Sequence, residues 1–323
     1  MRCLITGAAG FIGSHLTERL LAEGHEVWGI DNFADSYPRA LKERNLEVAR
    51  SWNRFRLFEK DVLARDLLPL LDGMDWVFHL AAQAGVRASW GHDFAGYLNN
   101  NVLATQRLLE TLARLQCARR FVYASSSSVY GEVGHLPLSE ILRPQPHSPY
   151  GVTKLAAEQL CMLYRRNFGL PVVALRYFTV YGPRQRPDMA LQRFCQATLA
   201  REPLRVFGNG AQRRDFTFVS DVVEANLLAA MTEDAVGEVL NIGSGVQATL
   251  HDVFMLLEEV SETHITLHYE SKQYGDVTET LADITRARQV LGYAPQVSLR
   301  MGLARQFAEL VDLYVRAGGS LVV

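Results

Sequence analysis

A tyrosine and a lysine stand four residues apart in the segment SPYGVTK, as Tyr150 and Lys154. Residues i and i+4 of a helix share one face, so a helix here would bring the phenol and the ammonium together. A neighbouring cation lowers the pKa of a phenol and makes a phenolate base accessible near neutral pH. The spacing therefore predicts a proton-transfer pair, with an ordinary surface helix as the alternative interpretation.

Four consecutive serines follow the apolar run RFVYA, and the last three of them are Ser126, Ser127 and Ser128. They stand where a buried strand would end, and open α/β sheets bind ligands at the carboxyl ends of their strands. We expect one hydroxyl to hydrogen-bond the substrate oxygen that Tyr150 deprotonates, and at least one other to cap the turn. The predicted catalytic group is Tyr150 and Lys154 with these three serines.

Three glycines, Gly7, Gly10 and Gly13, form a GxxGxxG pattern between an apolar run and a helical one. Glycines permit a tight turn and let backbone N–H groups approach a pyrophosphate at the positive end of a helix. The next strand ends in Asp31, 18 residues after Gly13, where a carboxylate accepts ribose hydroxyls and repels a 2′-phosphate. The pattern favours NAD over NADP, and a tight turn without a ligand is the alternative.

Six arginines lie in segments that flank these motifs: Arg87, Arg176, Arg184, Arg186, Arg213 and Arg214. Guanidinium groups bind phosphates and carboxylates through paired hydrogen bonds, so the set indicates an anionic substrate. Arg176 stands inside an apolar strand, and a structural ion pair is the alternative role for it.

Apolar runs alternate with helical patterns along the first half of the chain. The expected strands cover 2–6, 26–31, 55–62, 76–82, 120–125, 172–178 and 239–243, and the expected helices about 16–24, 93–116 and 149–167. Such alternation indicates a parallel sheet covered on both faces, which is the doubly wound α/β fold class. Asp61 and Val62 end the third strand, where we expect them to flank an adenine or to cap a loop.

After Phe178 the composition changes, because TVYGPRQRPDM is rich in Pro, Gly and Arg, as is typical of a loop over a site. We expect residues 1–178, with about 215–245, to form the dinucleotide-binding domain. Residues 179–214 and 246–323 are expected to form a smaller second domain.

The bulk composition limits the class of partner. A net charge of −2 gives no reason to expect a nucleic acid, and no apolar stretch reaches the roughly 18 residues of a membrane helix. The cysteines are scattered at Cys3, Cys117, Cys161 and Cys195 without a CxxC pair, which favours reduced thiols over a disulfide frame or a metal site. Because Met1 runs straight into a strand with no signal peptide, we expect a cytoplasmic protein.

Six segments together resemble the extended short-chain dehydrogenase/reductase family in its nucleotide-sugar epimerase branch, and especially the UDP-glucuronate 4-epimerases. They are GxxGxxG, HLAAQAGVRASW, SSSSVYGE, SPYGVTK, RYFTVYGPRQRPDM and RRDFTFVSDV, and the likeness runs over essentially the whole chain. The resemblance implies a Rossmann domain that holds NAD tightly and a smaller α/β C-terminal domain that holds the nucleotide sugar. It also implies a homodimer that pairs the helices expected near 93–116 and 149–167.

By position, the resemblance makes Tyr150 the base and Lys154 its partner on the cofactor ribose. The residues that it implies for NAD binding are Gly7, Gly10, Phe11, Ile12, Gly13, Asp31, Asn32, Asp61, Val62, Leu80, Ala81, Ala82, Tyr150, Lys154 and Tyr177. Those that it implies for the substrate are Arg87, Ser127, Thr179, Arg186, Phe207, Arg214 and Asp276. Arg214 matches the diphosphate-binding arginine, and Phe207 is expected to pack against the base or in the core.

The serine segment carries no carboxylate, and this distinguishes the reactions of the branch. The 4,6-dehydratases place an Asp-Glu pair at this strand end and the decarboxylases typically a Glu, whereas this chain has Ser127, Ser128 and Val129. Chemistry should then stop at oxidation and re-reduction, which predicts NAD-dependent 4-epimerisation of a UDP-sugar, UDP-glucuronate to UDP-galacturonate. The alternatives are a UDP-glucose/galactose 4-epimerase, a UDP-glucuronate decarboxylase, and a non-catalytic NAD-binding sensor or scaffold.

Arg186 matches the position that resembles the carboxylate anchor of the glucuronate epimerases, and a loop arginine serving phosphates or solvent is the alternative. A uronate oxidised at C4 is a β-keto acid, which loses CO₂ when its C5–C6 bond stands perpendicular to the carbonyl plane. An arginine that pairs with the carboxylate, with serines beside it, is expected to hold that bond away from this orientation.

Overall fold

Seven parallel strands form the central sheet of the computed structural model, which describes residues 1–64, 67–271, 275, 277–316 and 318. The strands are β1 (Arg2–Thr6), β2 (Glu26–Asp31), β3 (Phe55–Glu59), β4 (Trp76–His79), β5 (Arg120–Ser126), β6 (Val172–Tyr177) and β10 (Val239–Ile242). Their order is β10-β6-β5-β4-β1-β2-β3, and each neighbouring pair is parallel. The predicted fold class is confirmed, and the order reverses between β1 and β4, where such sheets bind ligands.

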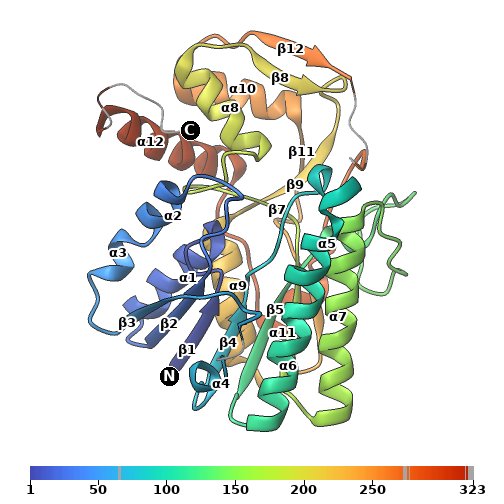
Figure 1. The fold of residues 1–323 in the computed structure, drawn as a ribbon. Helices are drawn as coiled ribbons and strands as arrows, with labels where there is room; N and C mark the ends of the chain where they lie inside the picture. Colours follow the sequence, from blue (N-terminus) through green and yellow to red (C-terminus); the bar gives the residue numbers. More distant parts are fainter. Residues whose placement is uncertain (65–66, 272–274, 276, 317, 319–323) are drawn as a thin grey trace.

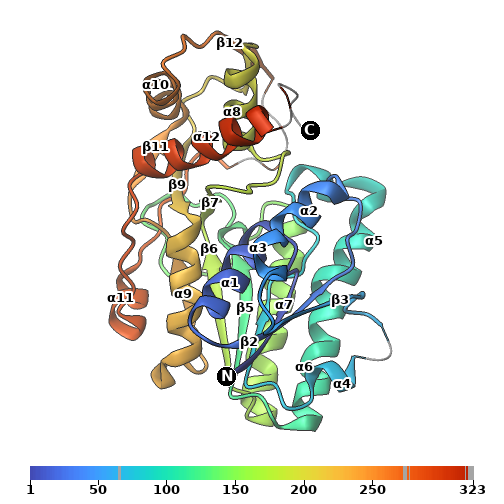
Figure 2. The same cartoon turned by 90° about the vertical axis from the view of Figure 1, so that its left-hand side faces the viewer.

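Helices cover both faces of this sheet (Figures 1 and 2). One face carries α1 (Phe11–Ala22), α3 (Glu47–Arg50), α9 (Val219–Met231) and α11 (Thr285–Leu291), and the other α4 (Leu68–Leu71), α6 (Ala104–Leu115) and α7 (Pro149–Phe168). Near the carboxyl ends of the strands lie α2 (Arg39–Asn45) and α5 (Phe94–Tyr97). In β1, Ile5 packs in the cluster of α1 and Leu4 in that of α6, so alternate side chains are buried on both faces.

The helix expected over 93–116 contains a change of pitch. It consists of α5, a π-helical stretch from Leu98 to Leu103, and α6. Within the stretch, the buried Asn101 accepts from the Gln83 amide at 2.7 Å and donates from Nδ2 to the Thr153 hydroxyl at 2.9 Å. These contacts join three segments beside the sheet edge, and such π-helical turns are frequent at functional sites.

A smaller region of the chain lies beyond the carboxyl ends of the strands (Figure 1). It holds the sheet β11 (Gln247–Thr249), β9 (Arg213–Phe218) and β7 (Thr179–Tyr181), and the pair β12 (Leu267–Glu270) and β8 (Leu204–Phe207). Its helices are α8 (Ala190–Ala200), α10 (Leu250–Ser261) and α12 (Leu299–Arg316), and α12 packs on the other two. Short 3₁₀ turns cover Arg87–Ser89, Gly91–Asp93, Ser127–Val129 and Glu233–Ala235. The expected domain boundaries stay a prediction.

A buried ion pair joins α7 to the sheet. Arg176 on β6 donates from NH2 to Glu158 Oε1 at 2.6 Å and from Nε to Oε2 at 3.0 Å, and the two side chains are 4% and 0% exposed. Ser125 donates to Glu158 Oε2 at 2.6 Å, and Arg176 NH1 donates to the Tyr130 hydroxyl at 2.9 Å. Of the two roles left open for Arg176, the structural ion pair is the one observed.

In the described part of the chain, no helix combines the length and the apolar character needed to cross a membrane.

Candidate active site

The glycine turn after β1 has the shape of a phosphate cradle. Gly7 has a φ of +75°, and a Cβ added to it would lie 2.9 Å from the Ala81 nitrogen. A Cβ added to Gly13 would lie 2.1 Å from the carbonyl oxygen of Gly7. Gly10 precedes α1 and forms no side-chain cap, so the first amides of the helix can bind an anion. The turn therefore fits the pyrophosphate of a dinucleotide.

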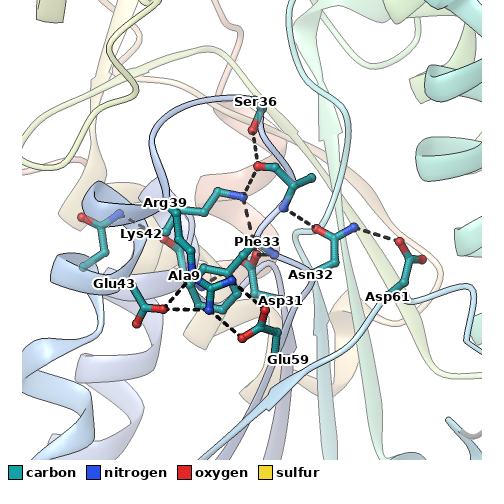
Figure 3. Close-up of polar contacts among 12 residues, drawn as sticks. Ala9, Asp31, Asn32, Phe33, Ser36, Arg39, Lys42, Glu43, Glu59 and Asp61 are labelled. Carbon is teal, nitrogen blue, oxygen red and sulfur yellow. Dashed lines mark hydrogen bonds and ion pairs between the residues drawn. The ribbon is translucent and has the colours of Figure 1, made fainter.

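Asp31 ends β2 and is buried, with both carboxylate oxygens in use (Figure 3). Oδ2 accepts from the Ala9 amide at 3.1 Å and Oδ1 from the Phe33 amide at 2.9 Å. Lys42 Nζ lies 3.6 Å from Oδ1 and donates to the Ala34 carbonyl at 2.9 Å. A carboxylate offers about four lone-pair directions, so Asp31 keeps capacity for ribose hydroxyls. The sequence did not predict that Lys42 lies beside Asp31, because no local pattern distinguishes this lysine of α2 from others.

Asn32 and Asp61 join the loops that follow β2 and β3 (Figure 3). Asn32 Nδ2 donates to Asp61 Oδ2 at 2.8 Å, and Asp61 Oδ1 accepts from the Leu63 amide at 2.7 Å. Asp61 thus caps its loop, as one of the two alternatives proposed, and Val62 beside it is buried. Contact of either residue with adenine stays a prediction.

Leu80, Ala81 and Ala82 follow β4 next to the glycine turn. The amides of Leu80 and Ala81 donate to the carbonyl and the hydroxyl of Thr6, each at 3.2 Å. His79, which precedes them, contacts the Thr6 hydroxyl through Nδ1 at 2.7 Å. Burial lowers the pKa of His79 to about 3, so its imidazole is uncharged near neutral pH.

Tyr150 stands in the first turn of α7, opposite the end of β5. Burial raises the pKa of its phenol, whereas the hydrogen bond with Ser126 and the charge of Arg186 lower that pKa. Lys154 was expected to supply this charge, but its ammonium lies 4.8 Å from the centroid of the Tyr123 ring. In this structure burial outweighs the groups that lower the pKa of Tyr150, and Arg186 is the cation among them. The role of Lys154 as the partner of Tyr150 stays a prediction.

The serines divide their roles. Ser126 lowers the pKa of the Tyr150 phenol as a hydrogen-bonding neighbour, and its Oγ accepts from the Ser128 amide at 3.1 Å, which caps the 3₁₀ turn. The expectation that at least one serine caps the turn is confirmed. Ser127 and Ser128 are half-buried in a turn that packs against α7. Their contact with a substrate stays a prediction.

Arg186 lies in the loop that follows β7, and its charge acts on the Tyr150 phenol. Burial raises the pKa of Tyr97 and of Tyr37, and the charge of Arg186 lowers both, as it does for Tyr150. The guanidinium is itself paired, because Nε donates to Asp188 Oδ1 at 2.9 Å and NH2 to Oδ2 at 2.6 Å. The structure therefore places an oriented arginine close to the predicted base.

Arg87 and Phe207, both expected at the substrate, contact each other, while their role in binding it stays a prediction. The guanidinium carbon of Arg87 is 4.4 Å from the centroid of the Phe207 ring, and that of Arg193 is 5.7 Å from the same centroid. Arg214 donates from NH2 to the Val277 carbonyl at 2.7 Å. Two arginines and an aromatic ring thus form a positively charged wall, in which sequence reasoning missed Arg193.

Several predicted residues have other partners. Arg184 binds Glu18 of α1 at 2.8 Å, and its amide donates to Glu309 of α12 at 2.8 Å, so it joins helices instead of facing the site. The Tyr177 hydroxyl donates to Asn226 at 2.9 Å.

Thr179 opens β7 and is half-buried, whereas Arg213 is exposed. Asp276 lies outside the described residues. Within the described ranges, no three His, Cys, Asp or Glu side chains are grouped so as to hold a metal ion.

A doubly wound sheet with a glycine turn, a buried carboxylate at the end of β2 and a tyrosine opposite the serine-rich end of β5 is typical of a dinucleotide-dependent enzyme. Residues 3–243 match the NAD dependent epimerase/dehydratase family, and the chain belongs to this family. NAD is therefore its cofactor, which confirms that prediction.

Relatives and solved structures cover nearly the full length. A Bacillus subtilis protein described as an uncharacterized UDP-glucose epimerase is 47% identical over 97% of this chain and 99% of its own. A UDP-glucuronate 4-epimerase of Thermodesulfobacterium geofontis is 35% identical over 94% of each chain. The UDP-glucuronic acid 4-epimerase of Bacillus cereus, solved with UDP-glucuronic acid and NAD, superposes with a TM-score of 0.94 at 45% identity, covering 97% and 100% of the two chains.

Lys154 generates a prediction about pH. Burial lowers the pKa of its ammonium to about 8, so above that pH the folded apoprotein carries a neutral lysine while the unfolded chain stays protonated up to about 10.5. From this group alone, stability rises between pH 8 and 10.5. If Lys154 binds the cofactor ribose, as the resemblance implies, affinity for NAD should fall over the same range, because a charged donor is lost. Fluorescence titration of the apoprotein with NAD should show a midpoint near pH 8.

The Lys154→Met variant serves as the control, since it should bind NAD weakly with a flat pH profile. The same midpoint in that variant would assign the pH dependence to another group.

Proposed function

We propose that this protein interconverts UDP-glucuronate and UDP-galacturonate by inverting C4. The broader activity, NAD-dependent 4-epimerisation of a UDP-sugar, is that of the relatives and solved structures named above. The observation that carries the proposal is the placement of Tyr150, in the first turn of α7, against the serine-rich end of β5, with the charge of Arg186 acting on its phenol. No Asp or Glu occupies the adjoining Ser127–Val129 turn, where a dehydratase or decarboxylase would need one.

The proton chemistry belongs to Tyr150 and the serines. When bound, NAD⁺ supplies the acceptor for the C4 hydride and later returns it to the ketone. Tyr150 takes the C4 hydroxyl proton while a serine hydroxyl holds the same oxygen, and the reverse step gives the proton back. The base that accepts this proton is the phenolate; burial raises the pKa of the phenol in the empty site, and a positive charge close to it lowers that pKa and makes the phenolate accessible. Between the two steps the flat 4-keto sugar turns over, and C4 is inverted.

Arg186 is the residue proposed to recognise the uronate. A guanidinium forms paired hydrogen bonds with a carboxylate, and here it is already placed near the base. Holding the C6 carboxylate also fixes the C5–C6 bond, which protects the β-keto acid from losing CO₂. Arg87, Arg193 and Arg214 would meet the diphosphate, and Phe207 the nucleobase.

A neutral UDP-hexose is the second candidate substrate. The Bacillus subtilis relative is described as a UDP-glucose epimerase, and the guanidinium of Arg186 is already neutralised by Asp188. A neutral sugar would not need the arginine. The identity of the product separates this candidate from the uronate.

Purified protein should convert UDP-glucuronate to UDP-galacturonate without added NAD and without release of a UDP-pentose. Tyr150→Phe should lower kcat by about 10²–10⁴-fold, the usual contribution of a general acid–base group, while NAD content stays unchanged. Product analysis by chromatography with mass detection checks both. Undiminished turnover in the variant would remove Tyr150 from the mechanism, and a UDP-pentose product would show decarboxylation.

Arg186→Leu should raise KM for UDP-glucuronate by about 10–100-fold, because a hydrogen-bonded charge pair with the carboxylate is lost. Binding of UDP-galactose, which has no carboxylate, should change by less than about threefold. A fraction of the UDP-glucuronate should then appear as UDP-pentose, since the C5–C6 bond is no longer held. Equal weakening for the charged and neutral sugars would contradict the carboxylate role.

We propose a homodimer through the outer faces of α6 and α7, in the cytoplasm, where UDP-sugar pools are used. Leu108 and Leu112 belong to the core, but Val152 and Leu163, three helical turns apart on α7, are 49% and 48% exposed. Light scattering should give twice the chain mass. Leu163→Glu should give a monomer, and Met255→Glu, at a 62% exposed position on α10, should not. A monomeric wild-type chain would refute the dimer.

A further inference from the structure

Among the residues that the structure describes, Asp188 alone binds the guanidinium of Arg186, and it does so along one edge. Asp188 takes the edge formed by Nε and NH2, with contacts of 2.9 and 2.6 Å. A guanidinium has five N–H donors on a planar fork, so this side-on contact leaves the terminal edge of NH1 and NH2 for a second carboxylate. A competitor for the ligand would occupy the terminal edge instead. The contact observed therefore orients the arginine without filling its ligand edge.

The backbone keeps the two residues at this spacing. The Met189 amide donates to the Arg186 carbonyl at 3.1 Å, which closes a four-residue turn with Pro187 at its second position. Proline favours that position because its φ is fixed there. The turn leads directly into α8, so Asp188 lies at the start of a helix, where a negative charge is favourable. The backbone position of Asp188 is thus fixed by the turn itself and does not require a bound substrate.

Asp188 also faces the other end of the substrate site. The pKa of its carboxyl is held low by the hydrogen bond and charge of Arg186, and by the charge of Arg193. Arg193, one turn into α8, lies 5.7 Å from the centroid of the Phe207 ring, the position proposed for the nucleobase. The carboxylate of Asp188 is thus paired with the arginine of the proposed sugar end and lies in the field of an arginine of the nucleotide end.

We propose that Asp188 is a positioning residue that sets selectivity for uronates by aiming the terminal edge of Arg186 at the sugar carboxylate. This inference rests on the proposed function. An arginine side chain has four rotatable bonds, and without a partner the substrate itself would have to order them on binding, at a cost in affinity. Asp188 removes this cost by ordering Arg186 beforehand.

Asp188→Asn in the NAD-loaded enzyme tests this. KM for UDP-glucuronate should rise about five- to tenfold, the effect expected when an orienting charged hydrogen bond is weakened at a partly exposed position. The value of kcat should stay within about twofold, because Tyr150 and Ser126 are untouched. The dissociation constant for UDP-galactose, measured by calorimetry, should not change.

Asp312→Asn is the matched control. Asp312 is 55% exposed and pairs with Arg316 at 2.7 Å on α12, while Asp188 is 56% exposed and pairs with Arg186 at 2.6 Å. The control variant should keep wild-type constants for both sugars.

Three results would overturn the proposal. They are an unchanged KM for UDP-glucuronate, a lower KM, which would make Asp188 a competitor, and equal losses for both sugars, which would indicate a structural role in the loop. If wild-type enzyme does not prefer UDP-glucuronate to UDP-galactose, the proposed function itself fails. A preference that survives Asp188→Asn overturns only the role of Asp188.

Discussion

Glu158 and Arg176 form an ion pair inside the protein, and the position of the reacting groups depends on it. Two charges away from water are tolerated when each has further hydrogen bonds, which Ser125 and Tyr130 provide here. The pair fixes α7 to β5 and β6. Glu158 lies eight residues after Tyr150 on α7, with Lys154 midway, so all three project from one helix face. Anchoring the last of them sets the depth of the phenol against the end of β5.

The loop after β7 is likewise held in place by contacts outside the proposed site. Arg184 is tied to Glu18 of α1 and Glu309 of α12, and the Gly182 amide donates to Gln306 of α12 at 3.1 Å. These contacts hold the loop between the sheet region and the smaller region. Arg186 follows within two residues, so its reach toward the phenol is set by helices that never meet the substrate. Recognition and catalysis thus depend on two separately anchored segments, α7 and this loop.

The sequence predicted the central strands because most of them are short apolar runs buried on both faces, the edge strand β3 being the least buried. It also located the glycine turn, Asp31 and the tyrosine-lysine spacing, since these are local patterns. No local sign in the sequence pointed to four residues that hold these groups in place: Lys42, Asn101, Glu158 and Asp188. Their roles depend on contacts with distant segments or on the orientation of a side chain. The burial of Tyr150, which raises the pKa of its phenol, could not be read from the sequence either, because spacing reveals a neighbouring charge but not the depth of burial.

The order of the central sheet has a consequence for synthesis of the chain. Its edge strand β10 ends at Ile242, whereas the neighbouring β6 ends at Tyr177, and β7, β8 and β9 intervene. While a ribosome is still translating that interval, β6 presents an open row of backbone donors and acceptors, which is a template for pairing with another chain. The dinucleotide-binding sheet receives its last strand, β10, only after part of the smaller region has been synthesised. The two regions are therefore coupled in assembly as well as in chemistry.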